Sequence, residues 1–194
     1  QNDLFKLCRN GEIALDRYLD FIKSYRREDS YLVLSSIYQS MRGIYFVFSM
    51  ENSWPRIWPK FKDVYSGTFS TVLNSLGWAP REGESQKDTL LRELAIRYLG
   101  FAEDPKVLEI AAEKFNGCLK GQELHPDIKA PVFFITAARG DEKVYGKMLS
   151  LYLKTQSPEE KRTLLMALGQ FKDPRIIEKF LKFSLTRMSE SRTL

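Results

Sequence analysis

One nine-residue segment occurs twice in the sequence, and this repeat constrains the fold more than any other feature. Residues 99–107 read LGFAEDPKV, and residues 168–176 read LGQFKDPRI. Both copies keep Leu-Gly, a three-residue gap, Asp-Pro, a cation and a β-branched apolar residue. In each copy the Asp side chain can cap the next helix. That helix can begin at the Pro, because the first residue of a helix needs no N–H. Two equivalent joints between helices predict stacked helical hairpins, which form a repeat architecture.

The repeat also predicts which residues form the joints. We expect Gly100 and Gly169 to end their helices in the left-handed conformation. A third joint is expected where Gly140 ends a helix and Asp141 caps the next. The three capping Asp residues are 37 and 32 residues apart, an interval typical of HEAT or tetratricopeptide hairpins. The complete set of predicted joint residues is Gly100, Asp104, Pro105, Gly140, Asp141, Gly169, Asp173 and Pro174.

The rest of the sequence favours helices as well. Apolar residues recur at helical spacing in four further segments, which are residues 3–24, 29–50, 64–76 and 85–99. Between them, Pro55 and Pro59 predict a Trp-rich turn over residues 53–60. The run VFFIT at residues 132–136 could form a buried strand, but it stands alone among helical segments. We therefore predict an all-α fold, an α-α superhelix or solenoid of HEAT-like helical hairpins, as one helical-repeat domain over residues 1–194.

Charge and cysteine content exclude several classes of protein. The net charge of +5 comes from 30 cations and 25 anions that are spread along the chain. No dense Lys/Arg block with interleaved aromatic residues supports nucleic-acid binding. No apolar run approaches the roughly 18–20 residues that a membrane span needs, so no membrane partner is expected. Two cysteines are too few for a disulfide framework, which fits a reducing compartment. The Lys/Glu-rich sequence and its compact loops favour a prokaryotic or archaeal protein with a cytoplasmic location.

The sequence offers little catalytic chemistry. The chain contains one histidine, His125, whereas a zinc site of the HExxH type needs two imidazoles one helical turn apart. His125 precedes Pro126 at a predicted helix start, where a surface or capping role explains it. The glycines are scattered singly and form no phosphate-binding loop. From its own residues, the chain is predicted not to be an enzyme and to bind no metal or cofactor.

Several segments, taken together, resemble the C-terminal helical domain of the zinc aminopeptidases with HExxH and GxMEN motifs. This family includes puromycin-sensitive aminopeptidase, the endoplasmic-reticulum aminopeptidases and the archaeal tricorn-interacting factors, and the chain resembles an archaeal tricorn-interacting factor. The resemblance covers essentially the whole chain. It rests on NDLFKLCRNG at residues 2–11, LGW at 76–78, HPDIKAPV at 125–132 and SPEEK at 157–161.

The resemblance implies a helical bowl that closes over a separate catalytic domain and controls peptide access to its active site. It implies zinc in that missing catalytic domain, and a parent aminopeptidase that degrades peptides downstream of a large protease. The partners it implies are the catalytic domain of the same parent chain and the peptide substrate. Both ends of the sequence look cut, and the family chain continues beyond residue 186, so we expect a domain truncated at its C-terminal end.

One residue is a candidate for contact with peptide. Tyr45 lies where the resemblance to the endoplasmic-reticulum enzymes places a Tyr-Lys pair for a peptide carboxylate, although Phe46 stands here in place of the Lys. The alternative for Tyr45 is an ordinary core aromatic residue. The alternative for the whole chain is a separate HEAT-type scaffold that binds a protein partner on its concave face.

Overall fold

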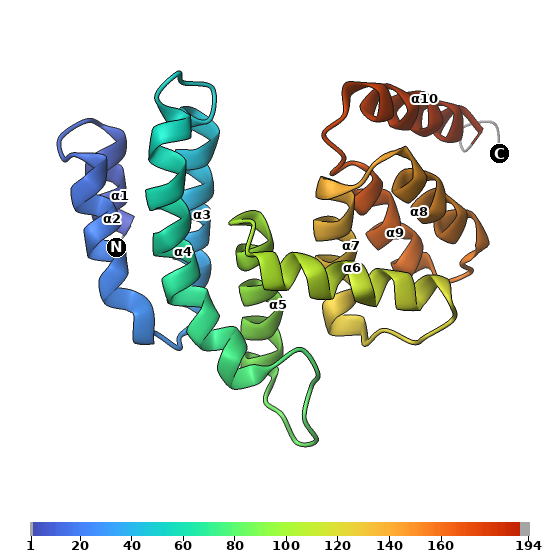
Figure 1. The fold of residues 1–194 in the computed structure, drawn as a ribbon, viewed down its shortest axis with the longest axis horizontal. Helices are drawn as coiled ribbons and strands as arrows, with labels where there is room; N and C mark the ends of the chain where they lie inside the picture. The colour runs from blue at the N-terminus through green and yellow to red at the C-terminus, as the bar shows by residue number, and fades with distance from the viewer. Residues whose placement is uncertain (1, 191–194) are drawn as a thin grey trace. The chain divides into compact units, whose positions relative to one another are not determined.

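The computed structural model describes residues 2–190, and every regular element in this part of the chain is a helix. The predicted all-α class is confirmed, and residues 132–136 are helical. The elements are α1 (Asn2–Arg9), α2 (Leu15–Lys23), the short 3₁₀ helix η1 (Ser24–Arg27), α3 (Tyr31–Phe48), α4 (Trp54–Leu76), α5 (Gln86–Phe101), α6 (Pro105–Leu119), α7 (Pro126–Arg139), α8 (Glu142–Lys154), α9 (Pro158–Leu168) and α10 (Pro174–Glu190) (Figure 1).

The chain divides into two compact units, Gln1–Val107 and Leu108–Leu194. In the first unit α4 packs along α5, while α2 and η1 contact α4 and α1 contacts α3. Aromatic rings fill the space between α4 and α5, where Phe69 and Tyr98 stack with centroids 3.7 Å apart. The single repeat domain over residues 1–194 stays a prediction.

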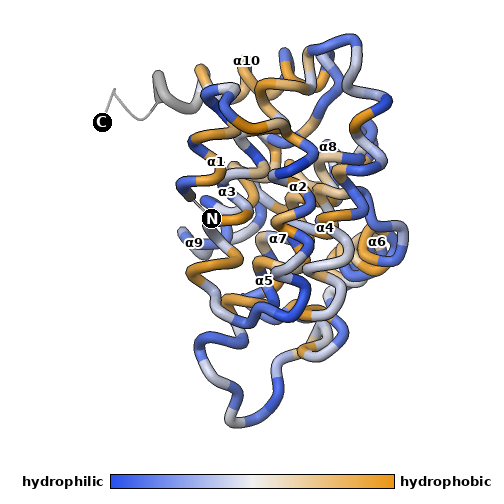
Figure 2. The backbone as a smooth tube through the Cα atoms, turned by 90° about the vertical axis from the view of Figure 1, so that its left-hand side faces the viewer, coloured by the Kyte–Doolittle hydropathy of each residue, from blue (hydrophilic) through white to orange (hydrophobic). Residues whose placement is uncertain are grey.

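In the second unit α9 packs against both α7 and α8. Its core is apolar, and the rings of Phe115 from α6 and Phe133 from α7 meet edge to face with centroids 6.1 Å apart. Hydrophobic and hydrophilic residues alternate along most helices (Figure 2), as expected when one face of each helix is buried. The connector of residues 77–85 between α4 and α5 is mostly hydrophilic (Figure 2).

The expected Trp-rich turn at residues 53–60 is wrong, because α4 begins at Trp54 and continues through Pro59 to Leu76. Pro55 lies in the first turn, where a missing N–H leaves no bond unmade. Pro59 follows one turn later, so that only one intrahelical bond is lost near the start of a long helix. The prolines therefore mark the beginning of α4 and do not interrupt it.

The joints have helix caps formed by their Asp side chains. Asp104 Oδ1 accepts a hydrogen bond from Val107 N at 3.1 Å, and Asp141 Oδ1 accepts one from Val144 N at 3.0 Å. In the second copy of the repeat, Asp173 Oδ1 accepts from Arg175 N at 2.8 Å. Hydrogen bonds from the Arg175 side chain lower the pKa of Asp173 to about 2. The helices that follow the two repeats begin at Pro105 and Pro174.

The expected left-handed conformation at Gly100 and Gly169 is wrong. Gly169 has a φ of −78°, and Gly100 is not among the residues with positive φ. In the first copy α5 runs on to Phe101, and Glu103 adopts the left-handed conformation with a φ of 62°. Asp104 N then bonds to Leu99 O at 2.8 Å and Glu103 N to Gly100 O at 3.2 Å, the bond pattern of a Schellman motif. In the second copy α9 already ends at Leu168, so its longer connection to Asp173 needs no left-handed residue.

Gly140 ends α7 for a reason other than backbone conformation. Its φ of −75° and ψ of 151° are open to any residue. A Cβ atom built on Gly140 would lie 2.7 Å from Cε1 of Phe171 and 2.8 Å from Cγ1 of Val144. Gly140 is therefore required by the close approach of the Phe171 ring, which also meets the ring of Tyr145 edge to face.

Candidate functional site

Tyr45, the predicted peptide contact, lies in an aromatic cluster of the first unit. Its half-buried ring meets Trp54 and Phe101 edge to face, with centroids 5.4 and 4.7 Å away. Trp58 is a third neighbour, at 5.7 Å. The ring thus has the packing of a core aromatic residue, while the adjacent Phe46 is 81% exposed. Contact between Tyr45 and peptide stays a prediction.

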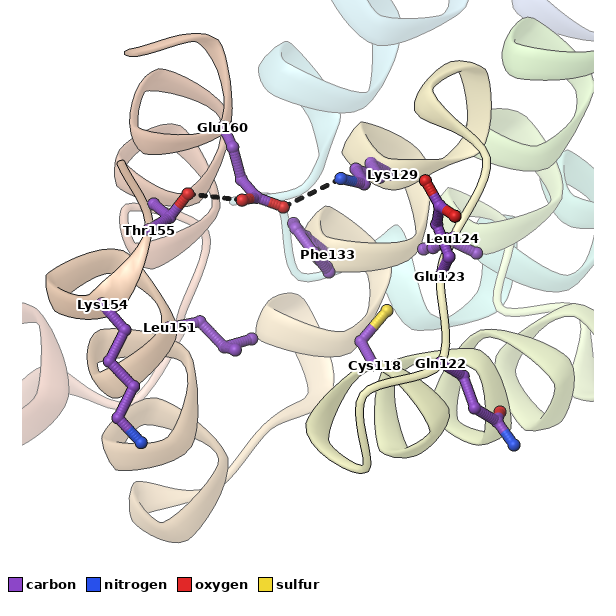
Figure 3. A pocket seen from close by; sticks show the side chains of 10 residues that line it. All are labelled: Cys118, Gln122, Glu123, Leu124, Lys129, Phe133, Leu151, Lys154, Thr155 and Glu160. Carbon is purple, nitrogen blue, oxygen red and sulfur yellow. Dashed lines mark hydrogen bonds and ion pairs between the residues drawn. The ribbon is translucent and has the colours of Figure 1, made fainter. Parts of the chain in front are cut away.

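The second unit contains a cavity of about 280 Å³ (Figure 3). Its lining comes from the C-terminal end of α6 and the loop after it, from α7, from the C-terminal end of α8 and the loop after it, and from the start of α9. The lining residues are Cys118, Gln122, Glu123, Leu124, Lys129, Phe133, Leu151, Lys154, Thr155 and Glu160. The cavity is close to the lower limit of about 300 Å³ for sites that take drug-sized ligands, so it suits a single side chain or a small fragment.

A carboxylate held by two donors forms one wall of this cavity. Glu160 Oε2 accepts from the Thr155 hydroxyl at 2.5 Å, and Glu160 Oε1 pairs with Lys129 Nζ at 2.9 Å (Figure 3). The hydrogen bond from Thr155, followed by that from Lys129, lowers the pKa of Glu160. Both charges are thereby neutralised locally, and this wall offers a fixed polar surface and no unpaired charge.

The cavity also has an apolar part of its lining, which contains a thiol. Phe133 and Leu124 are buried and Leu151 points its side chain into the space (Figure 3). Cys118 is a free, half-buried cysteine, and burial raises the pKa of its thiol. The thiol is therefore protonated at neutral pH and behaves as an apolar lining group.

The single histidine acts as a helix cap. Nδ1 of His125 accepts a hydrogen bond from Asp127 N at 3.4 Å at the beginning of α7. The same nitrogen lies 3.2 Å from Asp127 Oδ2, which can form an ion pair when the imidazole is protonated. The predicted capping role of His125 agrees with this geometry.

Sequence reasoning missed a buried ion pair that fixes the connector of residues 77–85. The fully buried Arg92 donates from Nε to Gly77 O at 3.0 Å and from Nη2 to a carboxylate oxygen of Glu84. The hydrogen bond from Arg92 lowers the pKa of Glu84. The connector is polar, which predicts an ordinary loop. The only sequence signal for this contact is the cation Arg92, which stands at an apolar position of α5.

Neither a metal centre nor a membrane span is found in the part of the chain that the structure describes. Residues 2–190 contain no group of three or more His, Cys, Asp or Glu side chains placed to hold a metal ion. They therefore do not fit a zinc ion, and no catalytic step through zinc follows from this chain. Within the same range, none of the helices combines the length and apolarity that crossing a bilayer requires.

Comparison with known proteins gives matches along the whole chain. The family model described as ERAP1-like C-terminal domain matches residues 1–194. Alanine/arginine aminopeptidase of Saccharomyces cerevisiae is 30% identical over 190 residues, which cover 94% of this chain and 21% of the relative. Aminopeptidase 2 of Candida albicans is 28% identical over 180 residues, covering 91% of this chain and 19% of the relative. Aminopeptidase M1 of Arabidopsis thaliana is 26% identical over 191 residues, covering 95% and 22%. The chain spans about a fifth of the length of these relatives.

Proposed function

Because the chain belongs to the family of ERAP1-like C-terminal domains, we propose that it works as the helical C-terminal part of a longer zinc aminopeptidase. In that parent protein it covers the catalytic domain and controls the access of peptides to the active site. The observation that carries this proposal is the family match over residues 1–194, together with relatives that are themselves named aminopeptidases.

The parent's other domain would supply the chemistry of hydrolysis. Zinc bound there would activate water and polarise the scissile carbonyl. The residues of this chain would supply surfaces of defined shape, because capped joints and closely packed helices keep their positions. The cavity of the second unit is one such surface, with an apolar floor and a wall of paired charges.

Two measurements test the proposal. The reading frame that encodes the chain should contain an HExxH motif upstream. The purified parent should hydrolyse aminoacyl chromogenic substrates and lose this activity on zinc removal, while the isolated 194-residue chain supplied with zinc should show no turnover. Metal-dependent hydrolysis by the pure isolated chain, or a parent without an HExxH motif, would refute the proposal.

A second candidate is a HEAT-type scaffold that binds a protein partner, and the exposed face of α10 favours it. Ile177, Leu181 and Leu185 follow one another at helical spacing and are 40%, 54% and 67% exposed. Such a stripe suits packing against another helix. A start codon and a stop codon directly flanking this segment would support the scaffold over the aminopeptidase.

Two finer predictions belong to the proposal. The first is that the parent acts downstream of a large protease; none of the three relatives described above is named a tricorn-interacting factor. Adding the parent to the peptide products of that protease tests this prediction. A cytoplasmic location is tested by fractionation of cells that express the parent with a tag. A parent recovered only with membranes or organelles would contradict that location.

A further inference from the structure

A line of lysines on α8 ends at Lys154, one of the residues that line the cavity of the second unit. Lys143, Lys147 and Lys154 lie within an arc of about 40° around the helix, since successive residues are about 100° apart. All three are exposed. Within the described residues, none of their ammonium groups has an ion-pair or hydrogen-bond partner. Leu151 lies beside this line and points into the cavity, and Lys154 is another of its lining residues (Figure 3).

Two of the nearby carboxylates are already in ion pairs. Glu142 on α8 pairs with Lys179, and Glu160 pairs with Lys129. Glu159, Glu123 and Asp141, which caps α8, are in no ion pair within the described residues, and Glu123 lines the cavity from the loop before α7. Three lysines against the carboxylate of Asp141 leave net positive charge on the α8 side, and Glu123 places a negative charge on the loop side.

The spacing of these groups matches an extended peptide. Lys143, Lys147 and Leu151 are each separated by four residues, or about 6 Å along the helix axis. Alternate residues of an extended chain point to the same side and are about 6.6 Å apart. Three alternate side chains of one peptide segment can therefore face these three positions in turn.

From this geometry we infer that α8 and the cavity form a binding site for an extended acidic peptide segment. Two acidic side chains at alternate positions pair with Lys143 and Lys147, and an apolar side chain two positions further on enters the cavity beside Leu151. Glu123 disfavours a further acidic residue beyond the apolar one. The inference rests on the proposed function in that it names the class of peptide that this domain holds.

The test uses the 194-residue chain and capped peptides that carry a neutral fluorophore. The acidic probe is acetyl-Glu-Gly-Glu-Gly-Leu-amide, and the control is acetyl-Lys-Gly-Lys-Gly-Leu-amide. Capping removes the terminal charges, so that recognition of a free carboxyl terminus does not contribute. Anisotropy should show binding of the acidic peptide that weakens as salt rises from 50 to 500 mM, and at least tenfold weaker binding of the basic peptide.

Two sets of variants connect binding to these lysines. One exposed ion pair changes an equilibrium constant by about 1.4- to 5-fold, so Lys143→Glu/Lys147→Glu should weaken acidic peptide binding about tenfold. The matched control is Arg162→Glu/Lys172→Glu, which reverses two exposed cations outside the cavity and should change affinity less than twofold. Equal losses in the two variants would overturn the inference, because they would show a response to net charge alone.

The cavity's own thiol reports whether the apolar side chain enters it. Saturating acidic peptide should slow alkylation of Cys118 by N-ethylmaleimide at least fivefold. Cys8, a half-buried cysteine of the first unit, serves as the internal control and should react at an unchanged rate. Unchanged alkylation of Cys118, or equal protection by an oligothymidylate of similar charge, would overturn the inference. Zinc-dependent activity of the parent on neutral substrates is measured separately, so its presence or absence decides the proposed function independently.

Discussion

The close contact at Gly140 makes a quantitative prediction with a built-in control. In Gly140→Ala the new methyl group would lie 2.7 Å from Phe171 Cε1, 2.8 Å from Val144 Cγ1 and 3.0 Å from the backbone oxygen of Thr136. Phe171 is only 3% exposed and is packed against Tyr145, so its ring cannot move without disturbing the core. Overpacking of this kind costs about 1–3 kcal/mol. The loss of glycine flexibility in the unfolded chain offsets about 0.4–1 kcal/mol of that cost.

The difference of these two ranges runs from about 0 to 2.6 kcal/mol, so we expect Gly140→Ala to lower the free energy of unfolding by about 1.3 kcal/mol. Gly146→Ala is the matched control, because Gly146 lies within α8 and a Cβ atom there would meet no other atom within 4 Å. Alanine is favoured over glycine inside a helix by about 0.5–1 kcal/mol. The control should accordingly raise the free energy of unfolding.

The assay is urea unfolding followed by circular dichroism, with the second unit's transition fitted separately if the two units unfold apart. A double variant, Gly140→Ala/Phe171→Leu, adds a second measurement. Because a smaller side chain relieves the contact, the double variant should be more stable than the sum of the two single changes predicts. Equal stabilisation by Gly140→Ala and Gly146→Ala, or simple additivity in the double variant, would refute the packing explanation for Gly140.

Three further predictions concern polar side chains. Arg92→Met should lower the free energy of unfolding clearly more than the exposed change Lys172→Met, because it removes the buried donor to the Gly77 carbonyl and to the Glu84 carboxylate. Tyr98→Phe should cost under about 1 kcal/mol or stabilise, because the buried Tyr98 hydroxyl has no hydrogen-bond partner within the described residues. Glu160→Gln should destabilise at pH 7 by about 1 kcal/mol. Because the folded-state pKa of Glu160 is lowered, that difference should shrink as the pH falls below its ordinary value of 4.5. Chemical unfolding at pH 7 checks all three predictions, and for Glu160→Gln it is repeated below pH 4.5.

The features that sequence analysis predicted correctly are local ones. An Asp that caps its own helix and a Pro that begins it need only neighbouring residues, as the hydrogen bond from Val144 N to Asp141 illustrates. The conformation of Gly100 depended on how far α5 continues, and packing against α4 extends that helix past the glycine. The role of Gly140 depended on Phe171, which is 31 residues away along the chain.

The cavity was missed for the same physical reason. Its polar wall joins Lys129 of α7 to Glu160 of α9, two residues that are 31 positions apart. In the sequence, Glu160 had a sufficient local explanation as a carboxylate in the first turn of a helix. Such a residue can serve both roles, and only the packing of α7 against α9 reveals the second. The remaining sequence signal is the helical spacing of the lysines of α8. That spacing predicts no binding site unless the position of the cavity is known.

The two copies of the repeated segment show what this sequence pattern encodes. In both, Asp accepts a backbone N–H and Pro begins a helix, yet the preceding helices end in different ways. The middle residue of the three-residue gap is Ala102 in one copy and Phe171 in the other, and both are buried. The pattern therefore sets where the next helix starts, while the size of this middle residue sets how closely the joint packs against its neighbours. Phe171 reaches Gly140 and so connects two joints. The start of the helix is therefore the same in both copies, while the residue in the middle of the gap differs from one joint to the next.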